Sequence, residues 1–109
     1  MGNVLKAVDI VQLTTSFTTI YTVPGSTKFT VTKLILTNTT AGAVTVQVCV
    51  VPNAGSVGVA NAILWNYSIA ANTFFEITKG DIWGAGTTLQ ALAGSGTSIN
   101  LKLAGIETS

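Results

Sequence analysis

Three observations predict that this 109-residue sequence folds into an all-β protein with two antiparallel sheets packed as a sandwich. The chain contains 18 Thr, 12 Val and 9 Ile, and such β-branched residues favour strands over helices. Apolar and polar residues alternate in short runs, which is the period of a half-buried strand. Turn-forming Gly residues, 11 in all, separate these runs. Eight short strands fit a sandwich, a jelly roll or a small barrel, and a two-sheet sandwich of the jelly-roll type is favoured.

Turn signals bound the first three strands, which are expected at residues 7–13, 17–23 and 28–38. Phe17, Tyr21 and Val23 share one face of the second strand. In the third strand the apolar phase switches partway along, because the apolar positions change from odd to even numbers. This switch predicts a bulge near Thr32 and Lys33.

The other five strands are expected at residues 44–51, 63–70, 73–79, 88–93 and 98–106. In the strand 63–70, Trp65 and Tyr67 share the apolar phase with Ile63 and Ile69, so both aromatic side chains are expected to fill the core rather than to form a platform for sugar. Cys49 falls on the polar phase of the strand 44–51 and is expected to act as a small apolar residue without a reactive role.

Residues 1–15 are expected to form an N-terminal strand or arm, and residues 16–109 a single β-sandwich domain. A helix is the alternative at the N-terminus, because Val4, Ala7, Val8 and Val11 also recur at helical spacing. No charged segment followed by an apolar one begins the sequence, so no signal peptide is expected. The tripeptides that start at Asn38 and at 66 match the glycosylation pattern and are interpreted as chance matches.

Charged residues are scarce and the chain is apolar: 8% of residues are charged, 48% are hydrophobic, and the mean hydropathy is +0.58. Soluble domains usually contain about 25% charged residues. No apolar run approaches the ~20 residues that a membrane helix needs, so no membrane association is expected. Hydroxyl and amide side chains replace charges on the outer faces of the strands. Such a surface is expected to be covered in an assembly.

The composition excludes most catalytic and ligand-binding chemistry. The chain has no His and a single Cys, so triads, His-bearing zinc sites and internal disulfides are not expected. The closest pair of carboxylates, Glu76 and Asp81, is interpreted as two solvated charges at strand ends. All five basic residues are dispersed Lys, which argues against nucleic-acid binding. We therefore expect no catalytic residue, no cofactor, no metal and no enzymatic activity.

Three residues are expected to contact partners. Trp83 lies in a turn-rich stretch between Ile82 and Gly84, and it is the aromatic residue most expected to be exposed or interfacial. Val4 and Leu5, two apolar residues near the start of the N-terminal segment, are assigned to the same role, in an arm that reaches a neighbouring subunit.

Several segments occur in a familiar order between residues 21 and 107. They include Tyr21-Thr22-Val23-Pro24, Asn38-Thr39-Thr40, the Val-rich run before Pro52, and Gly84-Ala85-Gly86-Thr87-Thr88-Leu89. In this order they resemble small β-sandwich virion proteins of tailed bacteriophages. The segment Phe74-Phe75-Glu76-Ile77 departs from the pattern of that group. The resemblance implies a jelly-roll-like fold, often trimeric, and a structural role without catalysis.

The function expected from this resemblance is that of a capsid decoration or cement protein. Such a protein stabilises the phage head by binding across junctions between capsid subunits. Its partners would be the major capsid protein and other copies of itself, as a homotrimer. It would be made in the host cytoplasm and located on the capsid surface of the virion. The alternative is a component of the tail, collar or fibre, with host-glycan binding through Trp83.

Overall fold

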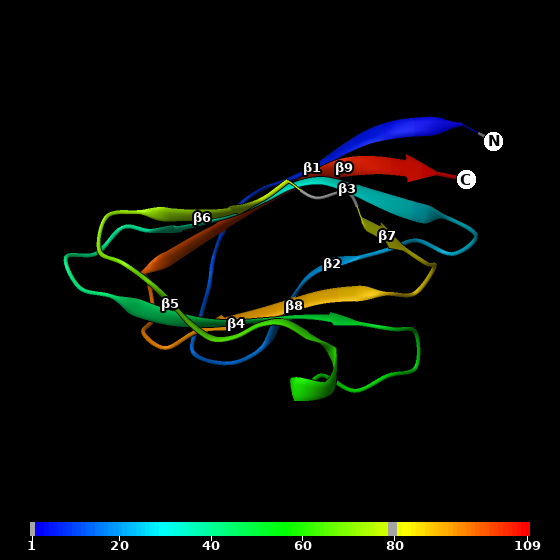
Figure 1. Ribbon diagram of the computed structural model, residues 1–109. Helices are drawn as coiled ribbons and strands as arrows, with labels where there is room; N and C mark the ends of the chain where they lie inside the picture. The colour runs from blue at the N-terminus through cyan, green and yellow to red at the C-terminus, as the bar shows by residue number, and fades with distance from the viewer. Residues whose placement is uncertain (1, 79–80) are drawn as a thin grey trace.

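The computed structural model describes residues 2–78 and 81–109 (Figure 1). These residues form nine strands and one short 3-10 helix, η1. In chain order they are β1 (Asn3–Gln12), β2 (Thr18–Thr22), β3 (Lys28–Asn38), β4 (Val44–Val51), η1 (Val59–Asn61), β5 (Ala62–Ile69), β6 (Phe74–Ile77), β7 (Asp81–Trp83), β8 (Thr88–Ala93) and β9 (Ile99–Thr108). No helix among the described residues has the length and apolar character needed to cross a membrane.

The strands form two antiparallel sheets that pack face to face as two layers (Figure 1). Sheet A has the order β1-β9-β3-β6, and β7 also pairs with β3. Sheet B has the order β2-β8-β4-β5. The predicted antiparallel sandwich of two sheets is therefore confirmed.

The strand pairs are nested within one another along the chain. β1 pairs with β9, β2 with β8, β3 with β6 and β7, and β4 with β5. This is the pairing of one long antiparallel ribbon folded at its middle. Two further pairings, β3 with β9 and β4 with β8, roll the ribbon into two sheets. This arrangement is the one expected of a jelly roll, the form of sandwich that the sequence favours.

The core lies between the sheets and is built from alternate residues of both. Sheet A contributes four Leu side chains with Phe29 and Trp83, and sheet B contributes mainly Val and Ala side chains with Tyr21. The largest fully buried apolar side chains are Phe29, Leu13, Leu34, Leu36, Leu89, Ile99, Leu101, Leu103, Val23, Val46 and Val48.

The bulge predicted in β3 is confirmed. The register between β3 and β9 shifts between Val31 and Lys33, and the Thr32 hydroxyl donates to the carbonyl oxygen of Ala104 at 3.1 Å. The bulge lies between the parts of β3 that pair with β7 and with β6. β6 lies within the strand predicted at 73–79, and the last residue of that prediction lies outside the described residues. β7 is a further strand that the sequence analysis did not predict.

The N-terminal segment is a strand, so the helical alternative is wrong. β1 begins at Asn3, before the predicted start at residue 7, and pairs with β9 along its whole length. Leu5 lies opposite Ile106, and the register shifts between Val8 and Val11. Pairing with β9 overrides the helical spacing of the apolar residues, because β9 offers hydrogen-bond partners to the backbone of residues 3–8, 11 and 12.

At one end of the sandwich, the amide group of Asn38 joins the two sheets. Asn38 ends β3 and is fully buried. Its Nδ2 atom donates to the carbonyl oxygens of Ile69 (2.9 Å) and Ala70 (3.3 Å) at the end of β5, and to that of Gly42 (2.9 Å). Its Oδ1 atom accepts hydrogen bonds from the backbone nitrogen of Thr40 at 2.9 Å and from the Thr40 hydroxyl at 2.7 Å. Asn38 therefore has a structural role and its side chain is not accessible for glycosylation.

At the opposite end, three aromatic rings fill the space between the sheets. The Tyr21 ring lies 4.6 Å from the Phe29 ring, which lies 5.6 Å from the ring of Trp83. The Tyr21 hydroxyl, from sheet B, donates to the carboxylate of Glu107 in sheet A. Burial, together with this carboxylate, raises the pKa of Tyr21 well above its ordinary value. The Trp83 indole N–H donates to the Asp81 carboxylate at 3.1 Å.

Candidate interaction surfaces

The charged residues are confined to one of the two sheets. The strands of sheet B contain none, whereas all strands of sheet A contain at least one. Those in sheet A are Lys6, Asp9, Lys28, Lys33, Glu76, Asp81, Lys102 and Glu107, and Lys79 lies outside the described residues. One exposed ion pair, between Lys33 and Glu76 at 3.7 Å, lies on sheet A. The two outer faces therefore differ in the partners that they suit.

A row of three aliphatic side chains and one threonine crosses the outer face of sheet A. β9 buries Leu101 and Leu103, so Ile106 points outward. The register then places Leu5, Ile106, Thr30 and Ile82 side by side across four strands. Leu5 is 84% exposed and Ile82 is 65% exposed. We call these four residues the aliphatic row.

The aliphatic row continues into an open sheet edge. Among the described strands β1 pairs with β9 alone, so its other edge carries backbone groups without a strand partner. A shallow apolar hollow of about 310 Å³, lined by residues of β1 and β9 with Thr32 of β3, lies beside Leu5. Val4 is 58% exposed on the same strand. Val4 and Leu5 are thus accessible, and their predicted role in an interface stays a prediction.

A second row crosses the outer face of sheet B. In β4, Gln47 alternates with buried Val residues and lies opposite Leu92 of β8. Trp65 and Asn66 of β5 lie beside Gln47, whose Nε2 atom donates to the Asn66 Oδ1 atom at 2.7 Å. Phe17, just before β2, stacks on Trp65 with ring centroids 6.4 Å apart and an interplanar angle of 26°. We call Phe17, Leu92, Gln47, Trp65 and Asn66 the aromatic row.

Neither Trp65 nor Tyr67 is buried in the core as predicted, and for Trp65 the reason is a bulge in β5. Tyr67 pairs with Val46 and Leu64 with Val48, so two residues of β5 lie opposite one residue of β4. The extra residue reverses the alternation and turns Trp65 toward the outer face. Asn66, at the bulge, has a left-handed backbone with φ of 53°.

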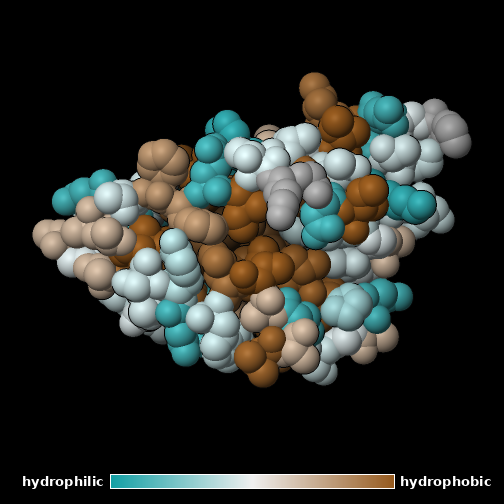
Figure 2. Space-filling model, viewed as in Figure 1, coloured by the Kyte–Doolittle hydropathy of each residue, from teal (hydrophilic) through white to brown (hydrophobic). Residues whose placement is uncertain are grey.

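Tyr67 remains on the inner side but lies at the edge of the sandwich, where it is 40% exposed. Its ring contacts that of Phe75 in β6 of sheet A, with centroids 4.7 Å apart. Figure 2 shows apolar side chains gathering between the two layers on this face of the molecule. Val50 of β4, Leu64 of β5 and Ile77 of β6 are partly buried and pack against the core.

The prediction that Trp83 is exposed is also wrong. Trp83 is only 5% exposed and packs on Phe29. The three residues of β7 pair with β3, where Trp83 lies opposite the buried Phe29, so this pairing turns the indole inward and Ile82 outward. Ile82, the immediate neighbour of Trp83, is the exposed apolar residue of this strand.

Cys49 is buried although it lies on the outer phase of β4. The connection that contains η1 covers it, and its thiol donates to the carbonyl oxygen of Gly58 at 3.4 Å. Burial raises the pKa of the Cys49 thiol. A raised pKa lowers the thiolate fraction at neutral pH, and that agrees with the small apolar role expected of this residue.

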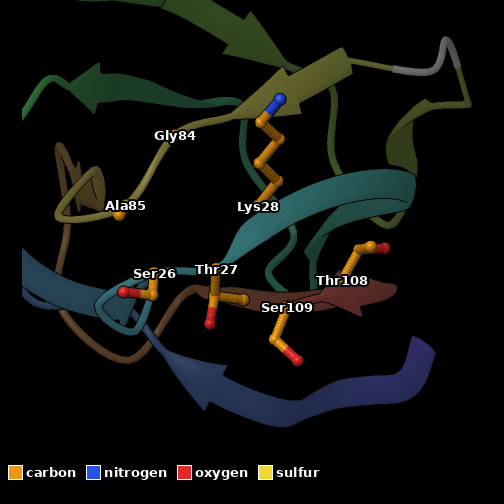
Figure 3. Close-up of a pocket in the computed structure, with 7 residues that line it drawn as sticks. All are labelled: Ser26, Thr27, Lys28, Gly84, Ala85, Thr108 and Ser109. Carbon is orange, nitrogen blue, oxygen red and sulfur yellow. The ribbon is translucent and has the colours of Figure 1, made fainter. Parts of the chain in front are cut away.

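A hollow of about 430 Å³ lies where the β2–β3 turn and the β7–β8 connection meet the C-terminal residues (Figure 3). Ser26, Thr27, Thr108 and Ser109 line it with hydroxyl groups. Figure 3 shows the Lys28 side chain pointing away from the hydroxyl groups of Ser26 and Thr27. In the part of the chain that the structure describes, no group of three or more His, Cys, Asp or Glu could hold a metal ion.

Comparisons with known proteins add little to this description. No family model matches the sequence, and no curated protein has a similar sequence. Among solved structures, one similar chain belongs to the structure of infectious bursal disease virus, Gx strain. The two chains have 11% sequence identity and a TM-score of 0.36, and the alignment covers 96% of this chain but 28% of the other. This chain thus spans little more than a quarter of that one, and the likeness does not establish a shared function.

Proposed function

We propose that this protein is a virion structural protein of a tailed bacteriophage, a decoration or cement protein of the capsid surface. The sequence resemblance between residues 21 and 107 is the source of this proposal. The observation that carries it is the aliphatic row, which lies next to the open edge of β1. No family model and no related sequence supports the phage assignment, so the proposal depends on these two points.

The aliphatic row and the β1 edge together suit a protein partner. Covering Leu5 and Ile82 would remove apolar surface from water, which is the main driving force of protein association. A strand of the partner could add to the open edge of β1 through backbone hydrogen bonds. The proposed partner is the major capsid protein, at a junction between its subunits. Contacts of this kind on two neighbouring subunits would hold them together.

Self-association is the second part of the proposal. The resemblance implies a homotrimer, and closed symmetric oligomers are the usual form of such assemblies. Size-exclusion chromatography with light scattering on the purified protein tests this part. A mass of three chains is the expected result, and a monomer at all concentrations would contradict it.

Co-sedimentation with phage heads that lack the protein tests the capsid contact. The wild-type protein is expected to bind and to raise the temperature at which the heads break. The double variant L5K/I82K is expected to bind at least 10-fold more weakly, because two cations would have to be buried without partners. Deleting β1 is a poorer test, since it would also expose the edge of β9.

The matched control is V59K, which makes the same change at a residue that is 66% exposed but lies in η1, away from sheet A. It is expected to bind as the wild type does. Equal binding by L5K/I82K and the wild type would rule out the aliphatic row as the contact. Binding to tails but not to heads would favour a tail, collar or fibre component.

A further inference from the structure

We propose that the aromatic row on sheet B is a binding site for a neutral glycan. This inference does not depend on the proposed function, because it concerns the opposite face of the sandwich and different residues. It also differs from the sequence-based expectation of glycan binding through Trp83, which is buried.

The stacked rings supply the apolar part of the site. Trp65 is 40% exposed and Phe17 is partly buried, so the pair presents ring surface to solvent while each ring supports the other. One side of a pyranose ring is a patch of C–H groups, and such a patch packs on the face of an aromatic ring. Aromatic side chains with a few placed polar groups are the usual lining of small-molecule sites.

Two amide groups beside the rings supply the polar part. The Gln47–Asn66 hydrogen bond uses one donor of Gln47 and the acceptor of Asn66. Within the described residues, no protein group bonds to the Gln47 carbonyl oxygen or to the Asn66 amide nitrogen. The Gln47 carbonyl oxygen and the Asn66 amide nitrogen therefore remain available to a ligand next to Trp65. A sugar hydroxyl both donates and accepts, so neighbouring hydroxyls can satisfy both groups.

The backbone holds these groups in place. Asn66 and Trp65 are the two residues of β5 that lie opposite Gln47 at the bulge, and bulges change the direction of side chains. Asn and Asp tolerate the left-handed backbone that Asn66 adopts better than most residues do. The amide group and the indole are therefore fixed side by side on rigid strands rather than on a loop.

The charge distribution indicates that the glycan is neutral. The strands of sheet B contain no Lys, so a sulfated or carboxylated sugar would find no cation there. A protein partner fits this face less well, because an apolar contact would remove water from the two free amide groups without replacing their hydrogen bonds.

Fluorescence titration of the W83F variant tests the proposal, since Trp65 is then the only tryptophan. The probes are dextran, mannan and a galactan, with dextran sulfate as the charged counterpart of dextran. At least one neutral polysaccharide is expected to change the emission in a saturable way. Binding is expected to be insensitive to salt, and dextran sulfate is expected to bind no better than dextran.

Variants assign the signal to the aromatic row. Q47A is expected to weaken binding at least 10-fold by isothermal titration calorimetry, whereas the control Q12A, in β1 of sheet A, is expected to leave it unchanged. W65A is expected to abolish binding, and W65F retains a ring if W65A does not fold. Calorimetry on the wild-type protein shows whether replacing Trp83 by itself changes the affinity for the glycan.

A flat titration with all three neutral polysaccharides would overturn the proposal. So would tighter binding of dextran sulfate, or equal affinity of Q47A and the wild type. A change in Trp65 emission on mixing with phage heads, with no response to any glycan, would assign the aromatic row to a protein interface instead.

Discussion

At one end of the sandwich a single buried amide joins the sheets, whereas at the other end three aromatic rings fill the space between them. Asn38 donates hydrogen bonds to carbonyl oxygens at the end of β5 and accepts one from the backbone nitrogen of Thr40. Tyr21, Phe29 and Trp83 act mainly through buried area, with one hydrogen bond from Tyr21 to Glu107.

The two ends should therefore respond differently to substitution. Removing the central group of a hydrogen-bond network breaks several bonds at once. Each buried partner is then left unsatisfied, which lowers the stability. An aromatic cluster tolerates the loss of a polar atom but not an added atom, since protein interiors are close-packed. The three variants below test this difference.

The largest effect is expected for G105A at the aromatic end. A Cβ atom on Gly105 would lie 2.3 Å from the carbonyl oxygen of Thr30 and 2.4 Å from the Phe29 ring, so the backbone of β3 would have to move. The free energy of unfolding is expected to fall by about 3 kcal/mol, as overpacking of a core does. Thermal denaturation followed by circular dichroism measures it.

G94A, at the end of β8 in sheet B, is the matched control. The close neighbour of its Cβ atom would be the Thr45 hydroxyl at 2.7 Å, which can rotate away. Its loss of stability is expected to be clearly smaller. Equal losses in G94A and G105A would show that Phe29 and the strand β3 adapt to the added atom.

The second effect is expected for N38A at the amide end. Alanine removes every side-chain bond of Asn38 and leaves the carbonyl oxygen of Ile69 without that donor. A loss of about 2 kcal/mol is expected in urea denaturation. N3A, at an exposed position of β1, serves as the control and should stay within about 0.5 kcal/mol of the wild type. A wild-type midpoint for N38A would mean that water replaces the amide.

The smallest effect is expected for Y21F, which keeps the ring and removes only the hydrogen bond to Glu107. A loss of about 1 kcal/mol is expected at neutral pH. The raised pKa of Tyr21 in the folded protein means that the native state keeps its proton when the unfolded state has lost it. The stability advantage over Y21F should thus be constant below about pH 10 and fall as the pH rises further.

Urea denaturation of both proteins at pH values between 7 and 11 measures this difference. Other groups titrate in the same range in both proteins, so only the difference between them reports on Tyr21. A difference that grows above pH 10 would contradict the direction of the pKa shift.

Local alternation was sufficient for much of the fold. The predicted strands 28–38, 44–51 and 88–93 coincide with β3, β4 and β8, because each is a regular run that ends at a turn signal such as Pro52. The bulge in β3 was also visible, since it changes the phase of the buried residues. The bulge in β5 was not, because the large side chains of Ile63, Trp65, Tyr67 and Ile69 keep one phase throughout the segment in the sequence.

The candidate surfaces depend on register, which local patterns do not contain. Leu5, Thr30, Ile82 and Ile106 are far apart in the sequence and meet only through the pairing of four strands. Trp83 was misplaced for the same reason, because its pairing with Phe29 is a tertiary contact. One feature of the sequence did indicate the uncharged face of sheet B. Residues 34–75 contain no charged residue, and this stretch includes β4 and β5.

The nested pairing of the strands has a consequence for how the protein is made. β9 lies between β1 and β3 in sheet A, yet it leaves the ribosome after the other eight strands described. Sheet A therefore lacks an inner strand until β9 has been synthesised, and β1 has no strand to pair with before that point. A chain that stops early cannot complete the face that carries the aliphatic row. Under the proposed function, a chain would therefore make the capsid contact only after β9 has joined sheet A.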